Sequence, residues 1–291
     1  MKNTMRKIIV VSFLSLMVAA LPATSRAEEQ KKPVEQKQEA DKVTGGIDLN
    51  VLSAYIWRGQ ELTRSSIVIQ PSATIGYKGF SFNVWGNLDT KPYSAAAANF
   101  GGKYTETDFT LSYSKKFGIF QMTPGYIYYA LGAANTSAAV PLDSQEVFLT
   151  LGLDTILSPT LTTYKEIDHY HQWYFLLGVS HTFVIHEKVG LKLAATASYL
   201  KSEDEGTYAK YDVNSAPTTD KYSNFHDGTV SVSIPVAVTK SLTITPTASY
   251  VFPLCDDAKY EMKGRGLQGV SSNTDRNSSF VYGGITLSFA F

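Results

Sequence analysis

The chain has 291 residues, with 26 Lys and Arg, 26 Asp and Glu, and a single cysteine. One cysteine cannot form an intramolecular disulfide or a cysteine-based zinc site, which excludes a protein stabilised by disulfides or by such a zinc site. Zero net charge provides no basic field for phosphates, which excludes a nucleic-acid-binding protein. A chain that is 18% charged and 12% aromatic is too apolar to be a disordered tail, and its 18 Tyr and 15 Phe favour strands over helices.

The N-terminus has the layout of an export signal. Three basic residues within the first seven positions precede an apolar run over 8–21, and Ser25 and Ala27 provide the small residues of a cleavage site. This run of about 14 residues is too short for a transmembrane helix, which needs ~20. We predict a signal peptide over 1–27, whose removal takes away four basic residues and no acid and leaves an acidic mature chain.

Residues 28–44 form a highly charged stretch without any aromatic side chain. Composition of this kind predicts a solvated periplasmic linker or a short polar helix, and does not decide between them.

From residue 45 to the C-terminus, apolar and polar residues alternate with the period of a β-strand. In 191–199 and again in 285–291 every second residue is apolar. About twelve such runs occur, many of 10–13 residues, which is the length that a tilted strand needs to cross a bilayer (~9–11). The pattern predicts an all-β transmembrane antiparallel barrel of about twelve strands over 45–291. A soluble β-sandwich, with shorter strands, is the alternative.

Connections and aromatic residues agree with the barrel. Short turns, such as 78–79 and 186–190, alternate with longer stretches near 59–65, 90–103, 131–144, 201–224 and 253–277, as periplasmic turns alternate with extracellular loops. The connection near His169 is shorter than this rule expects. Two aromatic girdles are predicted on the outer face: Tyr55, Trp57, Tyr128, Trp173, Tyr199, Tyr250 and Phe252 at the long-loop end, and Tyr77, Phe80, Phe120, Phe183 and Phe291 at the short-turn end.

The last strand ends in Phe291, with Phe289, Leu287 and Ile285 alternating before it. This ending is similar to the signal by which the bacterial outer-membrane insertion machinery recognises barrels. The other expected partners are outer-membrane lipid, lipopolysaccharide and small solutes.

The stretch 53–89 resembles the TorF-type (Gcw_chp) family of outer-membrane porins. The matching residues are Trp57, Arg58 and Gly59, then Pro71, then Gly79, Phe80, Phe82, Trp85, Gly86 and Asp89. The resemblance implies an outer-membrane barrel with a porin-like role. The charged linker and the long loops 201–224 and 253–277 depart from the family pattern, so it implies nothing about the solute.

Because alternate residues of a strand face opposite sides, each predicted strand has one set of positions that faces the lumen (its strand parity). These positions contain more acidic than basic residues. Acidic rings concentrate cations, so we hypothesise a narrow channel for small solutes or ions with a mild cation preference. Equally, the carboxylates could be solvated or paired across the lumen, and Arg58 could pair with Glu166 or Asp168. The pore-lining candidates are Asp48, Arg58, Asp89, Asp108, Glu146, Asp154, Glu166, Asp168, Lys192 and Asp227.

Two other functions stay open: a barrel enzyme acting on lipid, and a non-conducting receptor or adhesin that uses its loops. The sequence contains no G-x-S-x-G motif, and we predict no catalytic residue, metal or cofactor. Asp168–His171 and Asp256–Asp257 are weak metal candidates, and Cys255 is expected to be an inert thiol.

Overall fold

The computed structural model describes residues 42–63, 66–91, 102–132, 143–265 and 277–291, and long antiparallel strands make up most of these residues. The predicted signal peptide 1–27 and nearly all of the predicted linker 28–44 lie outside these ranges and stay predictions. The twelve long strands are β1 (Thr44–Leu52), β4 (Val68–Tyr77), β5 (Phe80–Asp89), β6 (Lys103–Tyr113), β8 (Phe120–Leu131), β9 (Ser144–Leu153), β10 (Thr160–Glu166), β11 (Gln172–His186), β12 (Val189–Ser202), β15 (Ser223–Ser233), β17 (Leu242–Pro253) and β18 (Phe280–Ala290).

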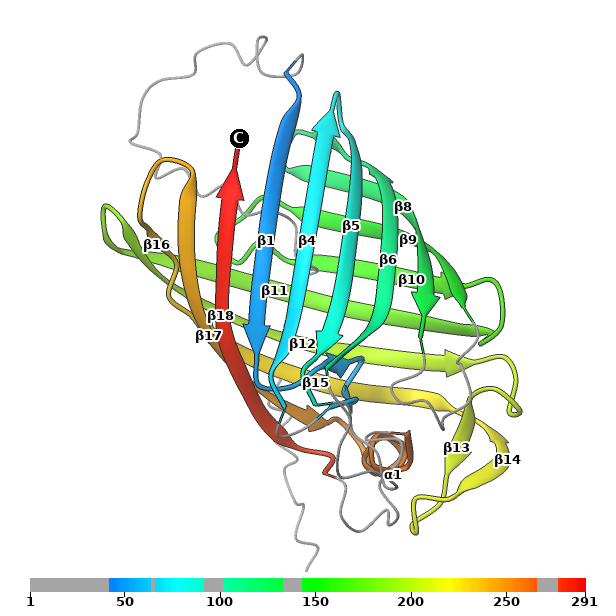
Figure 1. Ribbon diagram of the computed structural model, residues 1–291. Helices are drawn as coiled ribbons and strands as arrows, with labels where there is room; N and C mark the ends of the chain where they lie inside the picture. Colours follow the sequence, from blue (N-terminus) through cyan, green and yellow to red (C-terminus); the bar gives the residue numbers. More distant parts are fainter. Residues whose placement is uncertain (1–41, 64–65, 92–101, 133–142, 266–276) are drawn as a thin grey trace, which may run out of the picture.

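These strands close into one barrel (Figure 1). Each pairs antiparallel with the next along the chain, and β18 pairs back with β1, for example Leu287 with Leu49. The predicted all-β barrel of about twelve strands is therefore confirmed, including a strand on each side of the short connection near His169. The remaining elements are β2 (Ile56–Trp57), β3 (Gln60–Glu61), β7 (Lys115–Phe117), β13 (Ala209–Tyr211), β14 (Pro217–Lys221), β16 (Val236–Ala237) and the helix α1 (Asp256–Arg265).

The outer wall is apolar and the inner wall is polar. On β9, Val147, Leu149 and Leu151 are exposed to the outside by 43, 38 and 46%, whereas Thr150 between them bonds inside to Thr162 at 2.9 Å. Apolar side chains on this scale are exposed where lipid replaces water as the solvent. This is the fold of an outer-membrane β-barrel, in which the alternating sequence places one apolar and one hydrated face on every strand.

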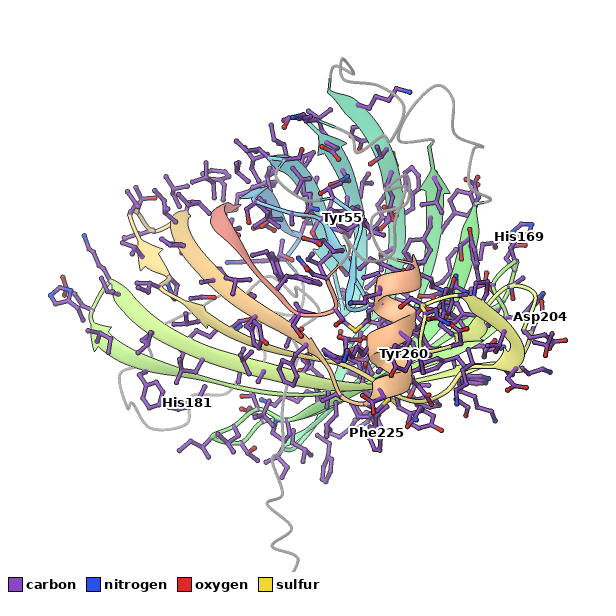
Figure 2. All side chains as sticks on the ribbon, turned by 90° about the horizontal axis from the view of Figure 1, so that it is seen from below. Tyr55, His169, His181, Asp204, Phe225 and Tyr260 are labelled. Carbon is purple, nitrogen blue, oxygen red and sulfur yellow. The ribbon has the colours of Figure 1, made fainter. Side chains whose placement is uncertain are left out.

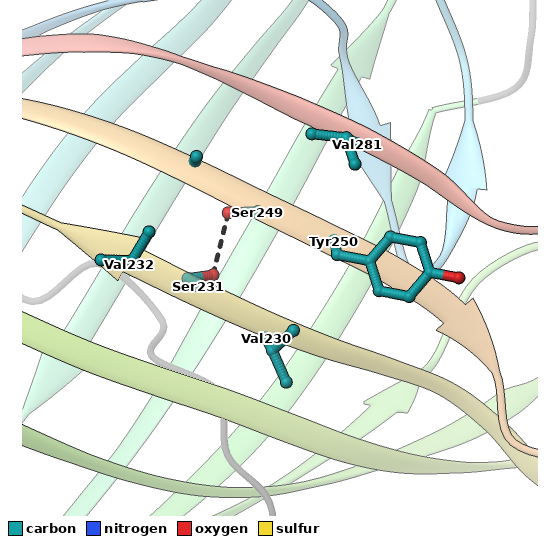
Figure 3. Close-up of a pocket in the computed structure, with 7 residues that line it drawn as sticks. Val230, Ser231, Val232, Ser249, Tyr250 and Val281 are labelled. Atoms are coloured by element: carbon teal, nitrogen blue, oxygen red, sulfur yellow. Dashed lines mark hydrogen bonds between the residues drawn. The ribbon is translucent and has the colours of Figure 1, made fainter.

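The outer wall carries a shallow apolar depression over β15, β17 and β18 (Figure 3). Val230, Val232 and Val281 line it, while Ser231 and Ser249 from the same strands hydrogen-bond to each other at 2.8 Å. The depression therefore belongs to the lipid-facing surface.

The two ends of the barrel differ. At one end the strands are joined by short connections, such as the two-residue turn Lys78–Gly79, and the C-terminal residue meets the first strand, with the Gly45 amide donating to the Phe291 carbonyl at 2.9 Å. At the other end lie β2, β3, β13, β14 and α1 (Figure 1). This is the predicted alternation of short turns and long loops.

The predicted long-loop girdle requires one correction, at Tyr55 and Trp57. Both were expected to face outward, but Tyr55 is buried inside the barrel and Trp57 packs against Arg58. The reason is that β1 ends at Leu52, so the period-2 pattern does not continue past Ser53.

An arginine at the middle of the outer wall should be far more damaging than one on the inner wall. Leu149→Arg places a charge in lipid and should destabilise the barrel by about 2–4 kcal/mol. Thr150→Arg, one residue along the same strand, faces water and should cost less than half as much. Urea unfolding in lipid vesicles measures both, and equal losses would contradict the assignment of the faces.

Candidate functional site at the long-loop mouth

The β2–β3 hairpin is built on a two-residue turn. Arg58 and Gly59 both have positive φ, 47° and 74°, and Trp57 pairs with Gln60 across them. Two consecutive positive φ values define a type I′ turn, whose twist matches that of paired strands. Glycine suits its position, whereas the left-handed arginine is a strained residue that its contacts must hold in place.

The hairpin crosses the lumen from one wall to the other. It leaves the barrel between β1 and β4, and the guanidinium of Arg58 at its tip lies 5.1 Å from the ring centroid of Tyr164 on β10 and 4.5 Å from that of Tyr174 on β11. In the order of strands around the barrel, β10 and β11 lie opposite β1 and β4. A chain segment laid across the opening narrows any path through it.

Arg58 is held by a buried ion pair. Its Nη2 atom donates to both carboxylate oxygens of Glu146 on β9, at 2.7 and 2.6 Å, and the two side chains are 7 and 1% exposed. Burial alone would lower the pKa of Arg58, but the Glu146 carboxylate outweighs it and raises the pKa, so the arginine is always charged. The expected partners, Glu166 and Asp168, were wrong: the hairpin directs Arg58 to β9 instead.

A β-bulge on β15 turns two consecutive side chains inward. The register with β12 shifts between Ala197 and Tyr199, where β15 carries one extra residue, and His226 and Asp227 are both fully buried. Asp227 accepts hydrogen bonds from Tyr174 at 2.7 Å and Ser198 at 2.7 Å. This bulge supplies the charged groups that meet the loops.

The helix α1 docks onto this bulge through one carboxylate. Glu261 lies 2.6 Å from His226 Nε2, and its other oxygen accepts from Gln60 on β3 at 2.9 Å and lies 3.1 Å from Arg265 Nε. His226 Nδ1 lies 3.0 Å from Asp227. Glu261 thus joins α1, the hairpin and the barrel wall, and α1 lies over the barrel opening when seen from this end (Figure 2).

An apolar cluster surrounds the docked helix. Ala258 and Met262 on α1 are completely buried, and the guanidinium of Arg265 lies 3.6 Å from the ring centroid of Tyr208. The cluster fills the mouth on the side of β11, β12, β17 and β18. Its buried members are Tyr174, Leu176, Leu200, Tyr208, Tyr222, Val251, Ala258, Met262 and Phe280.

The other side of the mouth, by β5, β6 and β8, is polar. Tyr55 donates to Glu106 on β6 at 2.7 Å and packs against Trp85 at 5.8 Å between ring centroids. Asp108 follows Glu106 on the same inward face of β6 and is opposite Trp85 on β5 and Tyr129 on β8. Glu106, which is buried, and Asp108 thus place two neighbouring carboxyl groups in the wall on the side of the mouth that α1 leaves free.

The predicted pore-lining residues fall into several groups. Asp48 on β1 is opposite Ser72 and Ser288 and faces the lumen, and Lys192 on β12 lies on the inward face as well. Asp89 is buried at the end of β5, where it accepts from Ser66 and from the Lys91 amide. Glu146 and Asp227 are buried and bonded as described above.

Glu166 organises a turn instead of lining a pore. Its carboxylate accepts from the amides of residues 168, 169, 170 and 171 at 2.7–3.1 Å, which closes the short β10–β11 connection. Two assignments need correction: Asp154 lies in a turn beyond β9, 65% exposed and paired with Lys116, and Asp168 bonds to Gln145 on the outward face of β9. Parity fails for both because each follows the end of its strand.

Within the described ranges, no group of three or more His, Cys, Asp and Glu side chains could hold a metal ion. The weak metal candidates at 168–171 and 256–257 therefore gain no support. Among the described residues, no helix is both long and apolar enough to cross a bilayer.

Several residues of the mouth have no counterpart among the sequence candidates: Tyr55, Glu106, His226, Glu261 and Arg265. Glu106 has the same parity as Asp108 and could have been found from it. His226 precedes an inward Asp227, so parity predicts that it faces outward, and only the bulge reverses this. Glu261 and Arg265 lie in a long loop, where period 2 carries no information.

Acid should loosen α1 through Asp257. Burial raises the pKa of this carboxyl, but hydrogen bonds from Asn224 (2.9 Å) and Lys210 (3.1 Å) outweigh it and lower the pKa. A lowered pKa stabilises the docked helix above the ordinary carboxyl pKa near ~4 and loses that effect as pH falls below it. Asp257→Asn should speed amide exchange of α1 about two- to fivefold at pH 7, and the variant and the wild type should converge near pH 3. A pH-independent ratio would contradict this.

Comparison with known proteins gives a likeness of fold only. No model of a known protein family matches the chain, and no curated protein matches it. Among solved structures, the chain is similar to the NanC porin, with a TM-score of 0.51 at 10% identity over 84% of this chain and 98% of that one. An outer-membrane channel from Pseudomonas putida F1 aligns with a TM-score of 0.44 at 8% identity over 90 and 100% of the two chains. The chain thus shares the barrel fold of a porin, while the resemblance to the TorF-type family stays a prediction.

Proposed function

We propose that this protein is an outer-membrane channel for the passive diffusion of small solutes or ions. The observation that carries the proposal is a closed barrel with a polar inner wall, narrowed at its long-loop end by a hairpin that crosses the lumen. A polar interior of this kind is the ordinary lining of a water-filled barrel. The long-loop end then faces the cell exterior, the outer wall contacts lipid and lipopolysaccharide, and the Phe291 strand is the signal for the insertion machinery.

The proposed mild cation preference rests on fewer acids than sequence parity assigned. Glu146 and Asp227 are buried and accept hydrogen bonds from protein donors, and Glu166 accepts from the amides of a turn. These three carboxylates therefore do not face an ion in the lumen. Asp48 in the lumen is the acid that a passing ion would meet, because Glu106 on the free side of the mouth is itself buried and accepts from Tyr55. Carboxylates in a narrow passage attract cations and repel anions.

Reversal potentials across a KCl gradient in planar bilayers test this proposal. The wild type should favour K⁺, and Asp48→Asn should move the K⁺/Cl⁻ permeability ratio about twofold toward one, because a charge that faces the lumen is lost. Asp154→Asn, in a turn outside the lumen, is the matched control and should leave the ratio unchanged. Anion preference in the wild type would overturn the selectivity, and no conductance under any condition would overturn the channel.

The filled mouth favours a second candidate, a non-conducting receptor that binds ligand through its outer loops. Loop binding without conductance would establish it. The enzyme alternative gains nothing from the buried Ser198, His226 and Asp227. Both nitrogens of His226 face carboxylates, so neither is placed to accept a proton from a serine nucleophile.

A further inference from the structure

The helix α1 has a small attachment to the barrel. Of its ten residues, only Ala258, Glu261 and Met262 are buried, and these lie on one face at spacings of three and four. The rest of the helix is polar, with acids in its first turn and bases in its last. Two apolar side chains, one of them an alanine, bury little area, so polar contacts decide how firmly the helix is held. Asp257 bonds to Asn224 and Lys210 at the partly exposed start of the helix, and Arg265 donates to the Thr207 carbonyl at its end, whereas Glu261 makes the contacts of the buried face.

Glu261 is completely buried and has partners on three segments of the chain. They are His226 on the bulge of β15, Gln60 on β3, and Arg265 one turn along α1. A carboxylate only accepts hydrogen bonds, so His226, placed between Glu261 and Asp227, donates from both nitrogens and is a cation. Removing the charge of Glu261 would leave His226 and Arg265 with an excess of positive charge in a buried place.

Three other side chains surround the contact between Glu261 and His226. Tyr208 accepts from Gln60 at 2.6 Å, the Tyr222 ring lies 5.4 Å from that of His226, and Asp227 is the second carboxylate. Each of them is bonded to the wall or to the loops, and none replaces the Glu261 carboxylate for both cations. The contact therefore depends on one side chain.

We propose that α1 is a detachable plug of the barrel mouth and that Glu261 is the latch that holds it. This inference rests on the proposed channel function. When the latch is broken, α1 leaves the apolar cluster and Gln60 loses its carboxylate partner, so the plug and the hairpin that crosses the lumen loosen together. The side of the mouth over β11, β12, β17 and β18 then opens to solute.

Amide hydrogen exchange of α1 in the full chain tests the latch directly. An isolated helix of ten residues does not persist in water, so undocking exposes its amides to exchange. Glu261→Gln keeps the shape of the side chain, removes its charge, and should speed exchange over 256–265 at least about tenfold, because an uncompensated buried cation is costly. The matched control Lys259→Gln, which changes one exposed charge on the same helix, should stay within about twofold.

Gln60→Ala provides a second variant with the latch residue intact. It removes one neutral partner of Glu261 and should speed exchange by a smaller factor than Glu261→Gln. If Glu261→Gln and Lys259→Gln exchange at the same rate as the wild type, the latch is wrong, whatever the channel does.

Single-channel recording of the same proteins separates the latch from the function. Faster exchange together with an open probability raised at least about tenfold in Glu261→Gln supports both. Faster exchange with no conductance in the wild type or in any variant supports the latch and overturns the proposed channel. Conductance in every variant with unchanged exchange overturns the latch and leaves the channel standing.

Discussion

Arg58→Met should release the β2–β3 hairpin from the lumen and cost about 3–5 kcal/mol of its docking free energy. The methionine fills much of the space of the arginine, but Glu146 is left buried without its cation, and the ring contacts with Tyr164 and Tyr174 lose their charge. Native-state hydrogen exchange over 53–63 measures the loss, where the Leu62 amide bonds to the Tyr55 carbonyl at 2.9 Å. Single-channel conductance should rise in parallel.

The matched control is Lys116→Met, which breaks the pair with Asp154. Both of those side chains are more than half exposed, so the change should cost less than about 1 kcal/mol. Adding Glu146→Gln to Arg58→Met removes the unpaired charge, keeps an acceptor for Tyr129, and should recover most of the loss. Equal effects of Arg58→Met and Lys116→Met would show that the hairpin does not depend on this ion pair.

Gly59→Ala should cost about 2–4 kcal/mol, from strain at positive φ and from overlap with the wall. The backbone has φ 74°, and a Cβ atom at this position would lie 2.5 Å from Cβ of Asp227 and 3.2 Å from Cε of Met262. The hairpin tip therefore reaches the bulge of β15 only because residue 59 has no side chain. Exchange over 53–63 and the conductance of the variant measure the effect.

Gly118→Ala separates the two causes. Gly118 has φ 62°, but a Cβ atom there would meet nothing within 4 Å, so its substitution reports the strain alone. It should destabilise the barrel by about 1 kcal/mol and leave the conductance unchanged. If both substitutions cost the same, close contact between Gly59 and Asp227 contributes nothing to the mouth.

Strand parity predicted the wall well because it depends only on neighbouring residues. Once a strand is exposed to lipid on one face, its side chains must alternate, and Leu149 and Thr150 were separated by that rule alone. The inward position of Asp48 follows in the same way. The rule fails at strand ends, as it did for Asp154 and Asp168. Beyond the last paired residue the backbone is no longer extended, so successive side chains no longer point to opposite faces.

Parity also fails at bulges. One extra residue on β15 brings His226 inside beside Asp227, and a second register shift on β6, between Glu106 and Tyr104, lies at the same end of the barrel. A bulge is an extra residue in one strand relative to the strand that it pairs with. The sequence of one strand does not show which of its residues lacks a partner on the other strand.

The alternation in the sequence was enough to predict a barrel of about twelve strands, the face of the residues inside its regular strands, and which end carries the long loops. Only the three-dimensional structure shows that the β2–β3 hairpin and α1 fold over the lumen, that Arg58 pairs with Glu146 instead of Glu166 or Asp168, and that most of the acids assigned to the lumen are already paired or hydrogen-bonded. The physical reason is that alternation is enforced locally by the pleat and by lipid. The partner of a loop charge is chosen only when barrel closure brings strands distant in sequence, such as β3, β9 and β15, to the same mouth.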